Sequence, residues 1–176
     1  NPDEPGDELD FRRAIDDAVA LDDPFVYLPD YIGINLIFNG DLDGPAWGGG
    51  ADVTCDGVTR WYGVTWMPPW GWRAHGVLAH EMGHALGLPH SSGPYSETYD
   101  SRWDVMSAAT GTCLMSDPIY GCLGTHTIAD YKVRLDWIPT VRRSVVDATP
   151  VVVTLAQHHA AVMPTGGENL YVRIRR

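Results

Sequence analysis

One stretch of the sequence indicates the fold, His80-Glu81-Met82-Gly83-His84-Ala85-Leu86-Gly87-Leu88-Pro89-His90. His80 and His84 are four residues apart on a predicted helix, so one turn places both imidazoles on the same face. Because Gly87 allows the backbone to turn sharply after the helix, His90 returns toward that face as a third nitrogen. The spacing therefore predicts that three histidines share one metal ion.

Three neutral nitrogen ligands are typical of a catalytic zinc site, because they leave the fourth position open for water. We expect His80, His84 and His90 to be the ligands. Glu81 lies beside the ion, close enough to reach that water without binding the metal. It is the expected general base and acid. The alternatives are ordinary hydrogen-bonded histidines, or a structural zinc site, which normally has four protein ligands.

The flanking sequence predicts alternating helices and strands. Apolar residues at helical spacing predict helices over about residues 9–21 and 72–86, the second capped by Gly87. Apolar and aromatic runs predict strands at residues 31–38, buried on both faces, and 58–67, separated by a loop that includes residues 39–50. Thr127 to Asp130 is similar to a capping box that opens a helix to about residue 137.

Two segments complete the predicted organisation. A Gly- and Ser-rich segment over residues 89–124 is long for a loop, and such loops are usually functional. Three Val-rich runs predict further strands, at residues 145–146, 151–155 and 170–174. We therefore predict an α+β catalytic domain over residues 1–143. A β-rich C-terminal segment over residues 144–176 follows, and it could be the start of a further module.

Charge and hydropathy exclude several classes of protein. The chain has 176 residues, with 12 basic and 23 acidic side chains and a formal net charge of −11. Such a charge argues against nucleic-acid binding. No run approaches the roughly 20 apolar residues of a membrane span. We expect a monomer that acts on a protein or peptide substrate.

The motif of residues 80–90 resembles that of the metzincin zinc endopeptidases. The resemblance continues in Trp103-Asp104-Val105-Met106-Ser107, which looks like the turn that carries a methionine beneath the metal in that clan. It covers about residues 8–138, including a C-terminal helix. The resemblance implies a twisted mixed sheet, a hydrophobic floor made by Met106, secretion, and zinc-dependent cleavage of an extended peptide. It also implies that the strand at 58–67 is the edge strand that pairs with substrate.

The subfamily stays open. Ser91 after the third histidine is similar to matrixins, whereas the long connection from His90 to Met106 is more like gametolysin-like and other secreted bacterial enzymes. Serralysins and astacins carry a metal-binding tyrosine two residues after the methionine. Here that position is Ala108, so that role is not transferred. The pocket that selects the substrate is expected between residues 107 and 120.

Cysteines and acidic residues give weaker indications. Cys113 and Cys122 could close one short disulfide loop in an oxidising compartment, although Cys55 could pair with either, or all three could be buried thiols. The acidic loop at residues 39–44, with Asp52 and Asp56, could bind Ca²⁺ or be a solvated turn. The remaining histidines are not expected to bind zinc: His75 points away on the helix, His126 opens a helix, and His158 and His159 lie in a predicted turn.

Two other functions stay open. The first is a zinc hydrolase that acts on a non-protein amide or ester, which length and motif do not exclude. The second is a binding module that retains a metal site without catalysis. The presence of Glu81 argues against the second, because a binding module needs at most the ligands.

Overall fold

The computed structural model describes residues 10–40, 46–92, 97, 99–107, 115–144, 152, 158–159 and 168–169. The chain divides into two compact units, residues 1–126 and residues 127–176. The predicted boundary after residue 143 therefore lies inside the second unit.

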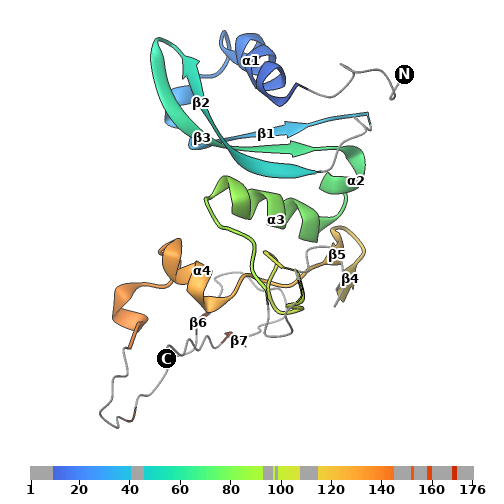
Figure 1. Cartoon of the computed structure of the whole chain (residues 1–176), viewed down its shortest axis with the longest axis vertical. Helices are drawn as coiled ribbons and strands as arrows, with labels where there is room; N and C mark the ends of the chain where they lie inside the picture. Colours follow the sequence, from blue (N-terminus) through green and yellow to red (C-terminus); the bar gives the residue numbers. More distant parts are fainter. Residues whose placement is uncertain are drawn as a thin grey trace. The chain divides into compact units, whose positions relative to one another are not determined.

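The first unit contains a three-stranded mixed sheet with a helix on each face (Figure 1). Its strands are β1 (Gly33–Ile37), β2 (Trp47–Cys55) and β3 (Val58–Met67), in the order β1-β3-β2. β1 is parallel to β3, and β2 is antiparallel to it. α1 (Phe11–Asp22) covers one face and α3 (His75–Ala85) the other. The predicted α+β class is confirmed.

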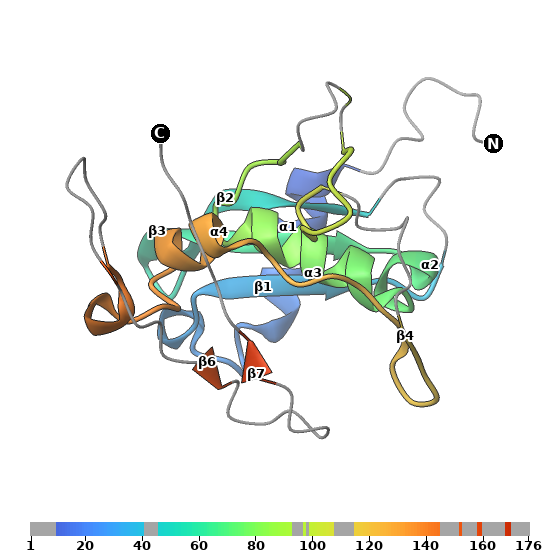
Figure 2. The ribbon, with the colours of Figure 1, turned by 90° about the horizontal axis from the view of Figure 1, so that it is seen from below.

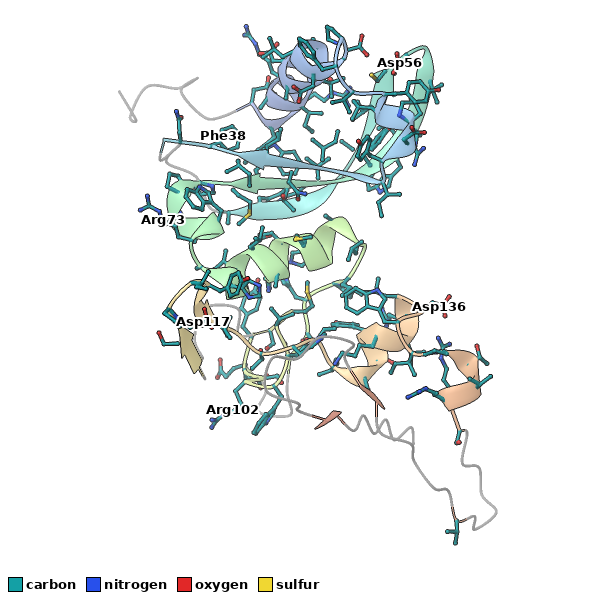
Figure 3. All side chains as sticks on the ribbon, turned by 180° about the vertical axis from the view of Figure 1, so that it is seen from behind. Phe38, Asp56, Arg73, Arg102, Asp117 and Asp136 are labelled. Atoms are coloured by element: carbon teal, nitrogen blue, oxygen red, sulfur yellow. The ribbon has the colours of Figure 1, made fainter. Side chains whose placement is uncertain are left out.

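The hydrophobic core lies between α1 and the sheet, where side chains fill the space (Figure 3). α1 begins where Asp10 accepts a hydrogen bond from the Arg13 amide at 3.0 Å, a side-chain cap of the kind that favours a helix start. The buried core residues alternate along the strands and recur at helical spacing on α1. They are Ile15, Val19, Leu28, Val53, Cys55, Tyr62, Val64 and Trp66.

Three expectations about the sheet are wrong. The strand at 58–67 has its predicted bounds, but it is the central strand, and β2 is an edge strand in its place. β1 is not buried on both faces: alternate residues are exposed, because α3 covers β2 and β3 rather than β1. The segment Trp47–Gly50 is strand and not loop, since it pairs with β3 along its whole length.

The other elements are short. In the first unit, η1 spans Leu28–Asp30, α2 spans Pro69–Trp72, and β4 (Met115–Asp117) pairs with β5 (Gly121–Leu123). The helix predicted over residues 72–86 corresponds to α3, which begins at His75. α2 is a separate turn of helix that ends at Trp72. None of the described helices is long and apolar enough to cross a membrane.

The second unit contains α4 (Ala129–Arg134), η2 (Thr140–Arg142) and the strand pair β6 (His158–His159) and β7 (Glu168–Asn169). α4 begins later than predicted, after Ile128, and no side chain caps it, so the capping box is wrong. His158 and His159 form a strand instead of a turn. The predicted strands at 145–146, 151–155 and 170–174 lie outside the described residues, Val152 excepted.

Gly63 in β3 lets the sheet approach α3 closely. A Cβ atom at Gly63 would meet the carbonyl oxygen of Ala85 and lie 2.9 Å from its carbonyl carbon. Both neighbours are backbone atoms, which cannot move aside as a side chain does. Glycine at position 63 therefore allows α3 to pack directly against the backbone of β3.

We expect Gly63→Ala to destabilise the fold by about 1–3 kcal/mol, the usual cost of overpacking a well-packed site. The midpoint of urea unfolding measures the effect. Gly40→Ala is the matched control, because a Cβ atom there meets nothing within 4 Å. An unchanged midpoint in Gly63→Ala would show that the sheet and α3 are not in this contact.

Candidate metal centre

α3 carries the first two histidines of the motif on a helix that runs roughly parallel to the strands (Figure 2). The helix ends at a turn in which Gly87 has φ +83, a backbone conformation that suits glycine. The Gly87 amide donates to the His84 carbonyl at 2.8 Å, and the Leu88 amide donates to the Gly83 carbonyl at 2.9 Å. The predicted cap is confirmed, and this turn directs the chain back toward the helix at His90.

His80, His84 and His90 form one cluster. The Nε2 atom of His84 lies 3.1 Å from Nε2 of His80 and 2.8 Å from Nε2 of His90. Two nitrogens bound to one zinc ion in tetrahedral geometry are about 3.3–3.4 Å apart, given Zn–N bonds of about 2.0–2.1 Å. The three nitrogens are therefore close enough together to share one ion.

Backbone carbonyls determine which nitrogen of two histidines carries the hydrogen. Nδ1 of His80 lies 2.6 Å from the Val105 carbonyl oxygen, and Nδ1 of His84 lies 2.8 Å from the Leu88 carbonyl oxygen. A carbonyl oxygen can only accept, so both Nδ1 atoms donate and both neutral rings have lone pairs at Nε2. Such partners fix the tautomer and orientation of metal-binding histidines.

The donor set fits a metal cation. Two Nε2 lone pairs that face each other repel unless a cation, either a proton or a metal ion, lies between them. Burial lowers the pKa of His80, and burial and the neighbouring His84 lower the pKa of His90. These shifts disfavour protonation of His80 and His90 at neutral pH. A divalent ion that prefers imidazole nitrogen satisfies the three lone pairs together.

Glu81 is half-buried and is held by the edge strand. The Gly48 amide of β2 donates a hydrogen bond to the Glu81 carboxylate. Burial raises the pKa of Glu81 to about 7, an effect that this hydrogen bond opposes. A cation in the histidine cluster would favour the carboxylate and lower that pKa again. A Cβ atom at Gly48 would lie 2.6 Å from the Glu81 carbonyl carbon, so glycine allows this approach.

The turn over residues 103–107 supports the helix. Met106 is fully buried, and a Cβ atom at Gly83 of α3 would meet its sulfur atom. The buried Asp104 accepts from the Ser91 hydroxyl at 2.6 Å and from the Met106 amide at 3.2 Å. Since Ser91 directly follows His90, these bonds connect the third histidine to the methionine turn.

The structure brings together most of the predicted site and adds residues that the sequence did not single out. Met106 lies against Gly83 of α3, and Glu81 follows His80 on the same helix, whereas His75 is an exposed residue at the start of α3. The added residues are Gly48, Asp104 and Tyr99. Asp104 belongs to the predicted methionine turn, but the sequence does not indicate its hydrogen bonds, and no local pattern marks Gly48 or Tyr99.

Several predicted features fall on residues outside the described part of the chain. Residues 108–114 lie outside the described residues; they include Ala108, Cys113 and half of the segment expected to select the substrate. Residues 41–44 of the acidic loop and the side chain of Cys122 also lie outside them. The Cys113–Cys122 disulfide and the Ca²⁺ site therefore stay predictions. Cys55 is a free, buried thiol.

A second group, Asp23, Cys55 and Asp56, also gathers potential ligand atoms. It lies at the β2–β3 turn, where Figure 3 labels Asp56, away from α3. The Cys55 thiol lies 2.7 Å from a carboxylate oxygen of Asp23, to which it donates. The thiol is therefore protonated, whereas a metal-binding cysteine is a thiolate.

We expect Cys55 to resist alkylation in the folded protein. The hydrogen bond to Asp23, with burial, raises the pKa of Cys55 from its ordinary value of 9.0 to about 12. At pH 8 such a thiol contains roughly a thousandfold less of the reactive thiolate than an unperturbed cysteine does. Peptide mass spectrometry after iodoacetamide treatment of native and urea-unfolded protein measures the difference. Equal labelling in both states would contradict the contact.

The comparisons with known proteins give no relative. No family model matches the chain, and neither the curated proteins nor the solved structures give a significant match.

Proposed function

We propose that this chain is a zinc-dependent endopeptidase of the metzincin kind, in which His80, His84 and His90 bind the ion. The observation that carries the proposal is the convergence of three histidine Nε2 atoms, with two of the rings oriented by backbone carbonyls. A half-buried glutamate, Glu81, directly follows the first of these histidines on α3. When bound, zinc supplies Lewis acidity, which acidifies water and polarises a carbonyl group.

Glu81 has the role of proton carrier in this proposal. Its carboxylate accepts a proton from the attacking water and then delivers that proton to the amine nitrogen that leaves the broken peptide bond. The Gly48 amide of the edge strand favours the charged form of this carboxylate. His80 and His84 carry their hydrogens on Nδ1 and would hold the ion through Nε2, so neither ring has a free lone pair to compete for that proton.

β2 supports an extended peptide as the substrate. Among the described residues β2 pairs only with β3, so its other edge presents backbone groups to which a further strand can add. Gly48 on this strand contacts Glu81, which brings a peptide bound along β2 close to the proposed proton carrier. Backbone pairing supplies affinity that does not depend on the peptide sequence.

We also propose an extracellular site of action. The resemblance to secreted metzincins supports it, together with the net charge of −11, which favours a soluble surface.

Cleavage of a mixed peptide library by the purified chain tests the proposal. We expect internal peptide bonds to be cut, cleavage to stop when 1,10-phenanthroline removes the metal, and cleavage to return when zinc is restored. Hydrolysis of simple amides or esters without peptide cleavage would instead identify a non-protein hydrolase. Stoichiometric zinc without any turnover would identify a binding module.

A further inference from the structure

Tyr99 lies at the histidine cluster although it follows the last predicted ligand by nine residues. Its hydroxyl oxygen lies 3.2 Å from Nδ1 and 3.2 Å from Nε2 of His90. The two rings meet edge to face, with centroids 4.7 Å apart, and the Tyr99 centroid is 6.4 Å from that of His80. Both the hydroxyl and the ring of Tyr99 therefore contact the third proposed ligand.

The backbone of Tyr99 is strained. Its φ is +61, a left-handed conformation that is uncommon for an aromatic residue. Such conformations persist where surrounding contacts require them, and they concentrate at functional sites. Burial does not account for this one, because 44% of the residue remains exposed. In this backbone conformation the Tyr99 side chain contacts His90.

The three histidines differ in how they are held. His80 and His84 are on one helix, and each donates from Nδ1 to a backbone carbonyl. His90 lies beyond the helix end and is exposed. A histidine that binds metal through Nε2 has its hydrogen on Nδ1, and it is usually oriented by the group that accepts this hydrogen.

We propose that Tyr99 is a positioning residue for His90, and that its hydroxyl oxygen accepts the Nδ1 hydrogen when Nε2 faces the metal. This inference rests on the proposed metal centre. The hydroxyl gives His90 the orienting contact that carbonyl oxygens give to the two helical histidines, and the phenol ring limits the tilt of the imidazole.

Tyr99→Phe tests the inference, because it removes the hydroxyl and retains the ring. We expect zinc affinity, measured by competition with a chromophoric chelator, to fall by about 10–100-fold, the usual effect of losing a group that orients a ligand. The circular dichroism spectrum and melting temperature of the metal-free protein should not change. Tyr31→Phe is the control, because Tyr31 is a 54% exposed tyrosine in another part of the chain. The zinc affinity of the Tyr31→Phe protein should equal that of the wild type.

Three results would overturn the inference. Equal zinc affinity in Tyr99→Phe and wild type would show that the hydroxyl does not position His90. A phenolate-to-copper charge-transfer band in the Cu²⁺-loaded wild type, absent from Tyr99→Phe, would make Tyr99 a direct ligand.

If the wild type bound no metal, the proposed function would fail. The contact between Tyr99 and His90 would then be tested in the metal-free protein. There, long-range ¹H–¹⁵N spectra should show the Nδ1–H tautomer of His90 losing population in Tyr99→Phe, and identical spectra would overturn the inference.

Discussion

We expect His84→Ala to abolish zinc binding and peptide hydrolysis together. His84 is the central member of the cluster, because its Nε2 atom lies within 3.1 Å of Nε2 of His80 and 2.8 Å of Nε2 of His90. Alanine at position 84 removes the nitrogen that lies next to both the His80 and the His90 nitrogens. Since enzymes typically accelerate reactions by about 10⁶-fold or more, loss of the ion takes turnover below detection. Zinc stoichiometry by atomic spectrometry and cleavage of a quenched peptide measure the two effects.

His75→Ala provides the matched control for this variant. His75 is an exposed histidine on the same helix and is not a member of the cluster. This variant should retain both zinc and activity, which separates loss of a ligand from general damage to α3. If His84→Ala kept stoichiometric zinc and full turnover, the metal site would be assigned to the wrong residues.

Glu81→Gln should keep the zinc and lose catalysis. Glutamine is nearly isosteric and retains a carbonyl oxygen that can accept from the Gly48 amide, so the contact between β2 and α3 survives. The amide cannot take up the proton of the attacking water. We expect kcat to fall by about 10²–10⁴-fold, the usual contribution of a positioned acid–base group. Steady-state kinetics on zinc-loaded protein measure the change.

The control for this prediction is Glu97→Gln, which removes an exposed carboxylate from the part of the chain that follows the third histidine. Its kcat should match that of the wild type. An unchanged kcat in Glu81→Gln would remove Glu81 from the mechanism. Loss of zinc from Glu81→Gln would show instead that the carboxylate is a ligand.

The sequence predicted best where a local rule determines the structure. The four-residue spacing of His80 and His84 fixes their common face on any helix, and Gly87 is suited to the left-handed turn that it adopts. The bounds of β3 were also predicted correctly, because turn residues flank its apolar run on both sides. These features need no information about distant parts of the chain.

Other features depend on tertiary contacts that leave little local signal. Three successive glycines at residues 48–50 disfavour a strand by propensity, yet they form part of β2. The first of them, Gly48, permits a close approach to the backbone of Glu81. The apolar run of β1 suggested burial on both faces, but its exposure depends on where α3 crosses the sheet. Tyr99 follows His90 by nine residues, and no periodicity in the sequence marks it as a neighbour of the cluster.

The ligands of the proposed centre occupy one contiguous stretch of eleven residues, and this makes the site almost transplantable. A designer could move residues 80–90 into another helix followed by a glycine turn, and His84 would keep its carbonyl partner, because Leu88 travels with it. His80 would not, since the Val105 carbonyl lies 25 residues further along the chain. A graft of residues 80–90 alone would thus contain the three proposed ligands but only one of the two backbone carbonyls that orient their rings. A faithful copy needs the distant methionine turn as well.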